Sequence, residues 1–214
     1  MITEGLDGLG DRLASYAERG AAFAKWRAVF DVDTITEYSA RANGHALARY
    51  AALCQEHGIV PIVEPEVLCT GDHDLDASQK ASHLALEALF AELEQAGFDL
   101  TGIVLKPNFV TPGLNAPPVG PDRVAEATLE VLRDTVPAAV PGIAFLSGGH
   151  RTDDVCRFLR TLHALEGRPW AVTFSFGRAL VSDALSTWSG APAQIDIAQQ
   201  ALVHNCRQAA EATR

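Results

Sequence analysis

Two of the three lysines in the chain lie in or directly after short apolar segments, where a cation is costly to bury. Lys25 lies in FAKWRAVF and Lys106 follows LTGIVL, while Lys80 lies in a polar stretch. A structural explanation is that each side chain reaches solvent or pairs with an acid. The catalytic explanation is that a lysine desolvated beside another cation loses its proton more easily. Its neutral amine can then attack a carbonyl carbon and form a Schiff base.

Carboxylates follow a neighbouring apolar segment. Glu64 and Glu66 come directly after GIVPIV. Glu64 near the two lysines would supply the general acid–base that is needed when water leaves the carbinolamine. Residues two apart share one face of a strand, so Lys25 and Arg27 are expected on one face, as are Glu64 and Glu66. We expect two cations and two carboxylates on the inner side of the sheet. There the opposite charges offset each other's cost of desolvation.

Two later segment ends carry groups suited to binding an anion. These groups are Ser147, Gly148 and Gly149 after GIAFL, and Ser175, Gly177 and Arg178 around the end of WAVTFSF. Paired glycines after a strand are most often a turn, but they also let backbone N–H groups approach an anion at a helix N-terminus. Arg178 supplies the fixed cation that a phosphate site needs. Together the two loops predict a phosphate site.

The Asp72-His73-Asp74 string offers metal-ligand chemistry, but three adjacent loop residues rarely converge on one ion. His150, after the paired glycines, is interpreted as a loop residue before a helix rather than as a base. We therefore expect neither a metal nor a cofactor.

Apolar segments alternate with longer amphipathic stretches along the chain. The predicted strands are 23–30, 58–63, 100–105, 142–146 and 170–176. The predicted helices are 9–19, 36–55, 76–95, 121–135, 153–165 and 195–210. Such alternation predicts an α/β fold with a parallel sheet covered on both faces. Because functional side chains cluster at the carboxyl ends of parallel strands, we expect these polar groups to meet on one rim.

Composition narrows the possible functions. A length of 214 residues favours one domain, 1–214, and 48% hydrophobic with 21% charged residues is ordinary for a soluble protein. A net charge of −10 argues against nucleic-acid binding. No apolar run reaches membrane-spanning length, and the first residues lack a secretory signal. Four widely spaced cysteines indicate free buried thiols in a reducing, cytoplasmic compartment.

Several strings resemble class I fructose-1,6-bisphosphate aldolase. They are GLDGL (5–9), FAKWR (23–27), ARYAALCQEHGIVPIVEPEVL (48–68), GDHDL (71–75), LKPNFVTPG (105–113), FLSGG (145–149) and PWAVTFSFGRAL (169–180). They occur in the order and spacing of the family and cover nearly the whole chain.

The resemblance implies a (β/α)8 barrel that reversibly cleaves fructose 1,6-bisphosphate to dihydroxyacetone phosphate and glyceraldehyde 3-phosphate, without a metal. It implies that Lys106 forms the Schiff base, Glu64 is the acid–base, Lys25 assists carbinolamine chemistry and Glu66 supports the charge network. Arg27 resembles a sugar-phosphate contact. The two anion-binding loops resemble the site for the ketose-side phosphate. Homo-oligomers are implied for the intact family.

The strand count departs from the family. The match begins before the family's fourth strand, so the first three βα units are absent, and with them an aspartate, an arginine and a second lysine of the family's site. We expect an incomplete barrel with about five parallel strands and sticky, unpaired edges. Two alternatives to the leading interpretation stay open. One is a lysine-dependent aldolase for another phosphorylated sugar. The other is an inactive remnant that acts only as a binding or oligomer partner.

Overall fold

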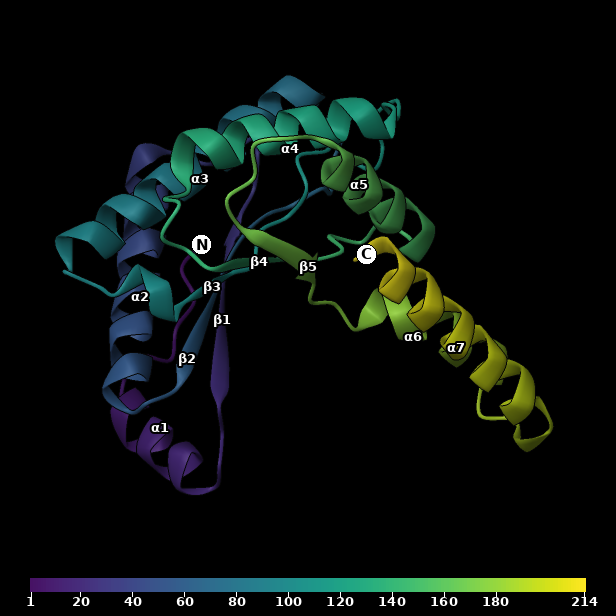
Figure 1. The fold of residues 1–214 in the computed structure, drawn as a ribbon, viewed down its shortest axis with the longest axis horizontal. Coiled ribbons are helices and arrows are strands. Elements are labelled where there is room, and N and C mark those ends of the chain that lie inside the picture. The colour runs from purple at the N-terminus through teal and green to yellow at the C-terminus, as the bar shows by residue number, and fades with distance from the viewer.

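Five short strands form one parallel sheet in the computed structural model, which describes residues 1–214 (Figure 1). The strands are β1 (Phe23–Phe30), β2 (Val60–Val67), β3 (Val104–Leu105), β4 (Gly142–Phe145) and β5 (Ala171–Phe174). Their order in the sheet is β1-β2-β3-β4-β5, and every neighbouring pair is parallel. The predicted α/β fold with five consecutive parallel strands is confirmed, and β1 and β5 remain open edges of an incomplete barrel.

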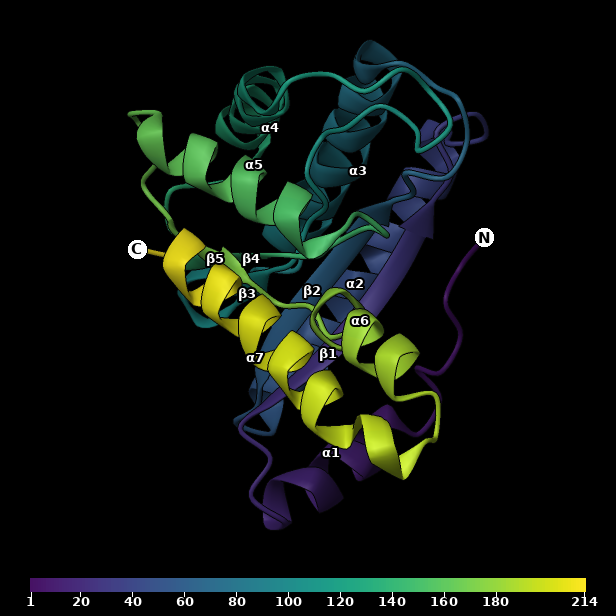
Figure 2. The same ribbon diagram turned by 90° about the vertical axis from the view of Figure 1, so that its right-hand side faces the viewer.

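Helices connect the strands and cover the outer side of the curved sheet. They are α1 (Leu9–Glu18), α2 (Glu37–Glu56), α3 (Leu75–Gln95), α4 (Pro121–Thr135), α5 (Thr152–Ala164), α6 (Arg178–Trp188) and α7 (Ile195–Ala212). Helices α2 to α5 follow the curve of the sheet, whereas α6 and α7 pack side by side beyond β5 (Figures 1 and 2). No helix has both the length and the apolar character needed to span a membrane.

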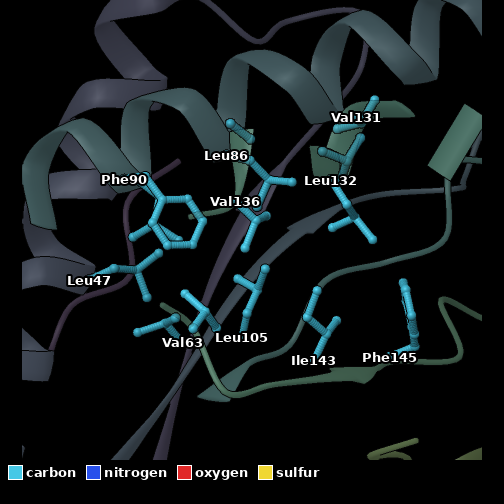
Figure 3. Close-up of a cluster of buried hydrophobic side chains, with 14 of the residues drawn as sticks. Leu47, Val63, Leu86, Phe90, Leu105, Val131, Leu132, Val136, Ile143 and Phe145 are labelled. Carbon is cyan, nitrogen blue, oxygen red and sulfur yellow. The ribbon is translucent and has the colours of Figure 1, made fainter. Parts of the chain in front are cut away.

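The core lies between the sheet and its outer helices. Val63, Leu105, Ile143 and Phe145 are all 0% exposed and point toward α3 and α4 (Figure 3). Alternation of side chains along a strand then sends the residues beside them, including Glu64 and Lys106, to the opposite, inner face. Packing of the core on one face thus determines which polar residues meet on the other.

Replacing Phe145 by alanine should destabilise the chain by about 3–5 kcal/mol, because a buried aromatic leaves a large cavity. Phe145 stacks on Phe109 with ring centroids 4.1 Å apart. Urea unfolding of Phe145→Ala measures the loss. Phe23→Ala is the matched control, since Phe23 is 65% exposed on the inner face and should change stability by less than about 1 kcal/mol. Equal losses in the two variants would contradict this account of the core.

The second strand is longer than the sequence predicted, because its two prolines do not break it. The N–H groups of Val60 and Leu68 donate to the carbonyls of Ala22, just before β1, and of Phe30, so the backbone groups at the odd-numbered positions between them face β3. Pro61 and Pro65 therefore lack a donor only on the side of β3, which is two residues long. Glu64 and Glu66 consequently lie inside the strand rather than after it.

Two further predictions of local structure were wrong. Most of the predicted strand 100–105 is not strand: Leu100–Gly102 forms a 3-10 turn, capped by the Asp99 side chain, which accepts from the Thr101 N–H at 2.9 Å. Helix α6 was not predicted, although its apolar residues recur at helical spacing.

Candidate active site

Glu64 lies between the two lysines of the inner face. Its Oε1 is 3.1 Å from Lys106 Nζ and its Oε2 is 3.1 Å from Lys25 Nζ. Glu64 is buried, with only 5% of its side chain exposed, Lys106 is 12% exposed and Lys25 is 43% exposed. One carboxylate therefore contacts two amines, one nearly enclosed and one open to solvent.

The strand register brings these three residues together. In the β1–β2 ladder Lys25 pairs with Ile62 and Arg27 with Glu64, so Lys25 and Glu64 are diagonal neighbours on one face. Lys106 follows β3 directly, and its N–H donates to the Val63 carbonyl at 2.8 Å. All three side chains lie opposite the helix-facing core.

A second ion pair lies next to this cluster. Arg27 Nε donates to Glu66 Oε2, and Glu66 is 7% exposed. The hydrogen bond from Arg27 to Glu66 raises the pKa of the guanidinium, and the charge of Glu66 acts in the same direction. Glu66 thereby holds Arg27 on the inner face beside Glu64.

The cluster lies farther from the rim than the sequence predicted. Lys25 and Glu64 lie in the middle of eight-residue strands, whereas β3 to β5 span only two to four residues. Because the strands differ in length, side chains of the β1 and β2 interiors stand level with groups that follow β3. The prediction that Glu64 and Glu66 follow the end of a strand is thus wrong, and Lys25 and Arg27 lie inside β1 rather than on the predicted rim.

The two predicted phosphate loops border one cavity of about 220 Å³. Ser147, Gly149 and Arg178 line it, together with Thr152 at the start of α5. Neither α5 nor α6 has a side-chain cap on its N-terminal N–H groups. Gly148 and Gly149 have φ of +58° and +94°, which side-chain-bearing residues rarely adopt. Two helix N-termini and an arginine make this cavity suited to a phosphate.

Three of the predicted anion-site residues do not line this cavity, and Gly148 contributes only the turn of its loop. The other two likewise contribute backbone geometry. Gly177 is the N-cap of α6, and the Ser175 N–H extends the ladder by donating to Phe145 O at 2.9 Å. Neither lines the cavity.

Two supporting residues were not found from the sequence. Cys69 Sγ contacts the Gly148 carbonyl oxygen beneath the glycine loop. The Asn108 side chain accepts from the Val67 N–H at 2.9 Å and ties the segment after Lys106 to β2. Neither residue was predicted to support the site, because Cys69 follows an apolar segment and Asn108 lies two positions after the more prominent Lys106.

Comparisons with known proteins identify the family of this chain. The family model described as fructose-bisphosphate aldolase class-I matches residues 1–214. The chain belongs to the class I fructose-bisphosphate aldolase family. It is 45% identical to cytosolic fructose-bisphosphate aldolase 6 of Arabidopsis thaliana over 99% of its own length, and 45% identical to the muscle-type aldolase of Lethenteron camtschaticum over the same share.

A solved aldolase has the same fold. The chain superposes on fructose-bisphosphate aldolase from Plasmodium falciparum, solved with TRAP and a small-molecule inhibitor, with a TM-score of 0.93 and 40% identity. This match covers 99% of the chain and 62% of the solved one. The chain likewise spans about 60% of the length of each of these two curated aldolases.

Neither the Asp72-His73-Asp74 string nor His150 joins the cluster around Glu64. Asp74 caps α3 by accepting from the Ala77 N–H at 2.8 Å, and no group of three His, Cys, Asp or Glu residues is placed to hold a metal. His150 Nε2 lies 3.1 Å from Thr111 Oγ1, and its ring packs edge-on against Phe158. The cysteines are unpaired, but Cys206 is exposed, which corrects the prediction that all four are buried.

Acidification should destabilise the chain partly through His150. Burial lowers the pKa of this histidine in the folded state, so below about pH 6.5 the unfolded chain binds protons more readily than the folded chain. Stability should therefore fall as pH drops from 7.5 to 5.5. Unfolding by urea at several pH values should show a flatter profile for His150→Gln. Some slope should persist, because burial also lowers the pKa of His163. An unchanged slope in the variant would contradict the assignment.

Proposed function

We propose that this chain carries the Schiff-base centre of a fructose-bisphosphate aldolase. The observation that supports it is the placement of one buried carboxylate, Glu64, at 3.1 Å from both inner-face lysines. Lys106 is the nucleophile because it is the more enclosed amine and follows a strand at the edge that also carries the anion cavity. The substrate is fructose 1,6-bisphosphate in the cleavage direction.

The geometry allows each step of a Schiff-base cleavage. Lys106 in its neutral form attacks the C2 carbonyl, and the carbinolamine loses water when Glu64 or Lys25 donates a proton to the leaving hydroxyl. Glu64 then accepts the proton of the C4 hydroxyl, and the C3–C4 bond breaks with its electron pair passing into the iminium. Glyceraldehyde 3-phosphate leaves, and the remaining enamine is protonated at C3 and hydrolysed to dihydroxyacetone phosphate.

The charged groups around the cluster bind the two phosphates of the substrate. Glu66 orients Arg27 toward the inner face, where the guanidinium binds the second phosphate. Ser147, Gly149 and Arg178 bind the ketose-side phosphate in the 220 Å³ cavity. Apart from its ion pair with Lys25 Nζ, Glu64 Oε2 accepts no hydrogen bond, which leaves a lone pair for a substrate hydroxyl.

The cellular setting follows from the relatives. Several related aldolases are named cytosolic or cytoplasmic, so we place this chain in the cytosol, acting on a phosphorylated sugar without a metal or cofactor. Residues 1–214 are proposed to act as one domain within a homo-oligomeric enzyme.

Borohydride trapping tests the proposal directly. The chain is incubated with dihydroxyacetone phosphate, the imine is reduced with borohydride, and peptides are mapped by mass spectrometry. We expect the adduct at Lys106. Absence of any adduct from a folded sample would refute an active Schiff-base centre in this chain, while family membership would stand. A sugar-phosphate panel separates fructose 1,6-bisphosphate from other phosphorylated ketoses.

Chelation should leave the trapping reaction unchanged, because the steps above use only lysine and carboxylate groups. Imine trapping before and after dialysis against EDTA provides the measurement, with the rate expected to agree within error. A loss that Zn²⁺ restores would instead favour a metal-dependent mechanism.

A further inference from the structure

The loop between β4 and α5 is a β-turn whose middle peptide joins two glycines. The His150 N–H donates to the Ser147 carbonyl at 2.9 Å and closes the turn over Gly148 and Gly149. Their φ angles of +58° and +94° match a type I′ turn. A type II′ turn spans the same four residues with the middle peptide turned over. Because glycine adopts either form without a steric penalty, the turn alone does not determine which way this peptide points.

The direction of the middle peptide decides whether the loop can bind an anion. A trans peptide holds its C=O and N–H on opposite sides, and the chain has no cis peptide bond. The Gly148 carbonyl oxygen contacts Cys69 Sγ, so the Gly149 N–H points away from Cys69. Gly149 lines the anion cavity together with Arg178, whereas Gly148 does not. The Gly149 N–H donates to no backbone carbonyl, which leaves it available to an anion.

Cys69 is a fixed anchor beneath this loop. It follows β2, is only 7% exposed, and its carbonyl accepts from the Leu114 N–H at 2.7 Å. Its Sγ lies 3.6 Å and 3.8 Å from the positions that a Cβ would take on Gly148 and Gly149, so the thiol packs against both glycines. Burial raises the pKa of the Cys69 thiol. The thiol therefore stays protonated near neutral pH and can donate its S–H.

We infer that Cys69 is a positioning residue of the anion cavity: its S–H donates to the Gly148 carbonyl and holds the turn in the form that presents the Gly149 N–H to a phosphate. This inference rests on the proposed function, because it concerns the phosphate cavity of the same site. An S–H group is a weak donor, but the peptide between two glycines turns over at little steric cost. A phosphate binds only the fraction of chains with the correct turn, so a shift in that fraction changes its apparent affinity directly.

A titration with inorganic phosphate, followed by amide NMR, tests the unmodified chain. We expect the Gly149 amide resonance to shift with saturation. The Gly97 amide is the control, because Gly97 also has a positive φ, +65°, but follows α3, and its resonance should not move. A Gly149 resonance that stays in place at saturating phosphate, or the absence of any binding, would overturn the inference without the need for a variant.

Three variants test the thiol. Cys69→Ala should weaken phosphate binding by about three- to tenfold, the range for loss of one hydrogen bond. Cys69→Ser should stay within about twofold of the parent, since its hydroxyl also donates. Cys54→Ala is the control, because Cys54 is a fully buried thiol of the core on α2 and should leave binding unchanged. Urea unfolding verifies that each variant is folded. Parent-like binding by Cys69→Ala, or equal weakening in Cys69→Ser, would overturn the inference.

A comparison of two ketones separates positioning of the phosphate from a general structural effect. Imine trapping at Lys106 is measured with dihydroxyacetone phosphate and with dihydroxyacetone, which lacks the phosphate. Cys69→Ala should raise the half-saturating concentration of the phosphorylated ketone only. Equal losses with both ketones would contradict a positioning role. If the unmodified chain forms no adduct, the proposed function fails, while the phosphate titrations still decide the role of Cys69.

Discussion

Replacing Lys106 by arginine should abolish borohydride-trappable imine, reducing the adduct below detection. The guanidinium stays protonated near neutral pH and cannot act as a nucleophile. Arginine keeps the positive charge, and with it the ion pair that Lys106 makes with Glu64 at 3.1 Å, so the variant should fold. Mass spectrometry after reduction with dihydroxyacetone phosphate measures the result.

Lysine scarcity makes this experiment well controlled. The chain has only Lys25, Lys80 and Lys106, so an adduct can be assigned among three side chains. Lys80→Arg, on the exposed side of α3, should leave trapping unchanged. An adduct at Lys25 in the Lys106→Arg variant would show that Lys25, not Lys106, is the nucleophile. Full trapping in this variant would refute the proposed mechanism.

Patterns that rest on burial were predictable from the sequence. Short apolar segments indicated the five strands, because strands covered by helices have little need of polar residues. Lys25 and Lys106 stood out for the same reason, since a charged side chain in such a segment must have a partner. Glu64 was that partner, and two-residue periodicity correctly placed Lys25 with Arg27 and Glu64 with Glu66.

Features that depend on strand length and on the meeting of distant segments were not predictable. Glu64, Pro65 and Glu66 suggested the end of a strand, and only the short β3 beside Pro65 explains why the strand continues. The anion cavity requires the first turns of α5 and α6 to converge, where Thr152 Oγ1 donates to Ala179 O at 2.6 Å. Helix α6 has no fully buried residue, so its apolar face did not resemble that of a core helix.

Replacing Glu64 by glutamine should slow imine formation by about 10²–10⁴-fold, the usual contribution of a positioned general acid–base. Glutamine has nearly the same shape but cannot take up or release a proton, so Lys25 and Lys106 would lose the group that connects them. Stopped-flow or quenched trapping with dihydroxyacetone phosphate gives the rate constant, and urea unfolding verifies that the variant is folded.

Glu66→Gln is the matched control for this prediction, because Glu66 lies on the same strand and face and is equally buried, at 6% against 4% exposed. Its partner is Arg27 rather than a lysine, so its loss should weaken binding of the phosphorylated substrate more than it slows imine formation. A larger rate loss in Glu66→Gln than in Glu64→Gln would transfer the acid–base role to Glu66. Equal, small losses in both would mean that water or Lys25 moves the proton, and that the position of Glu64 between two lysines only balances their charge.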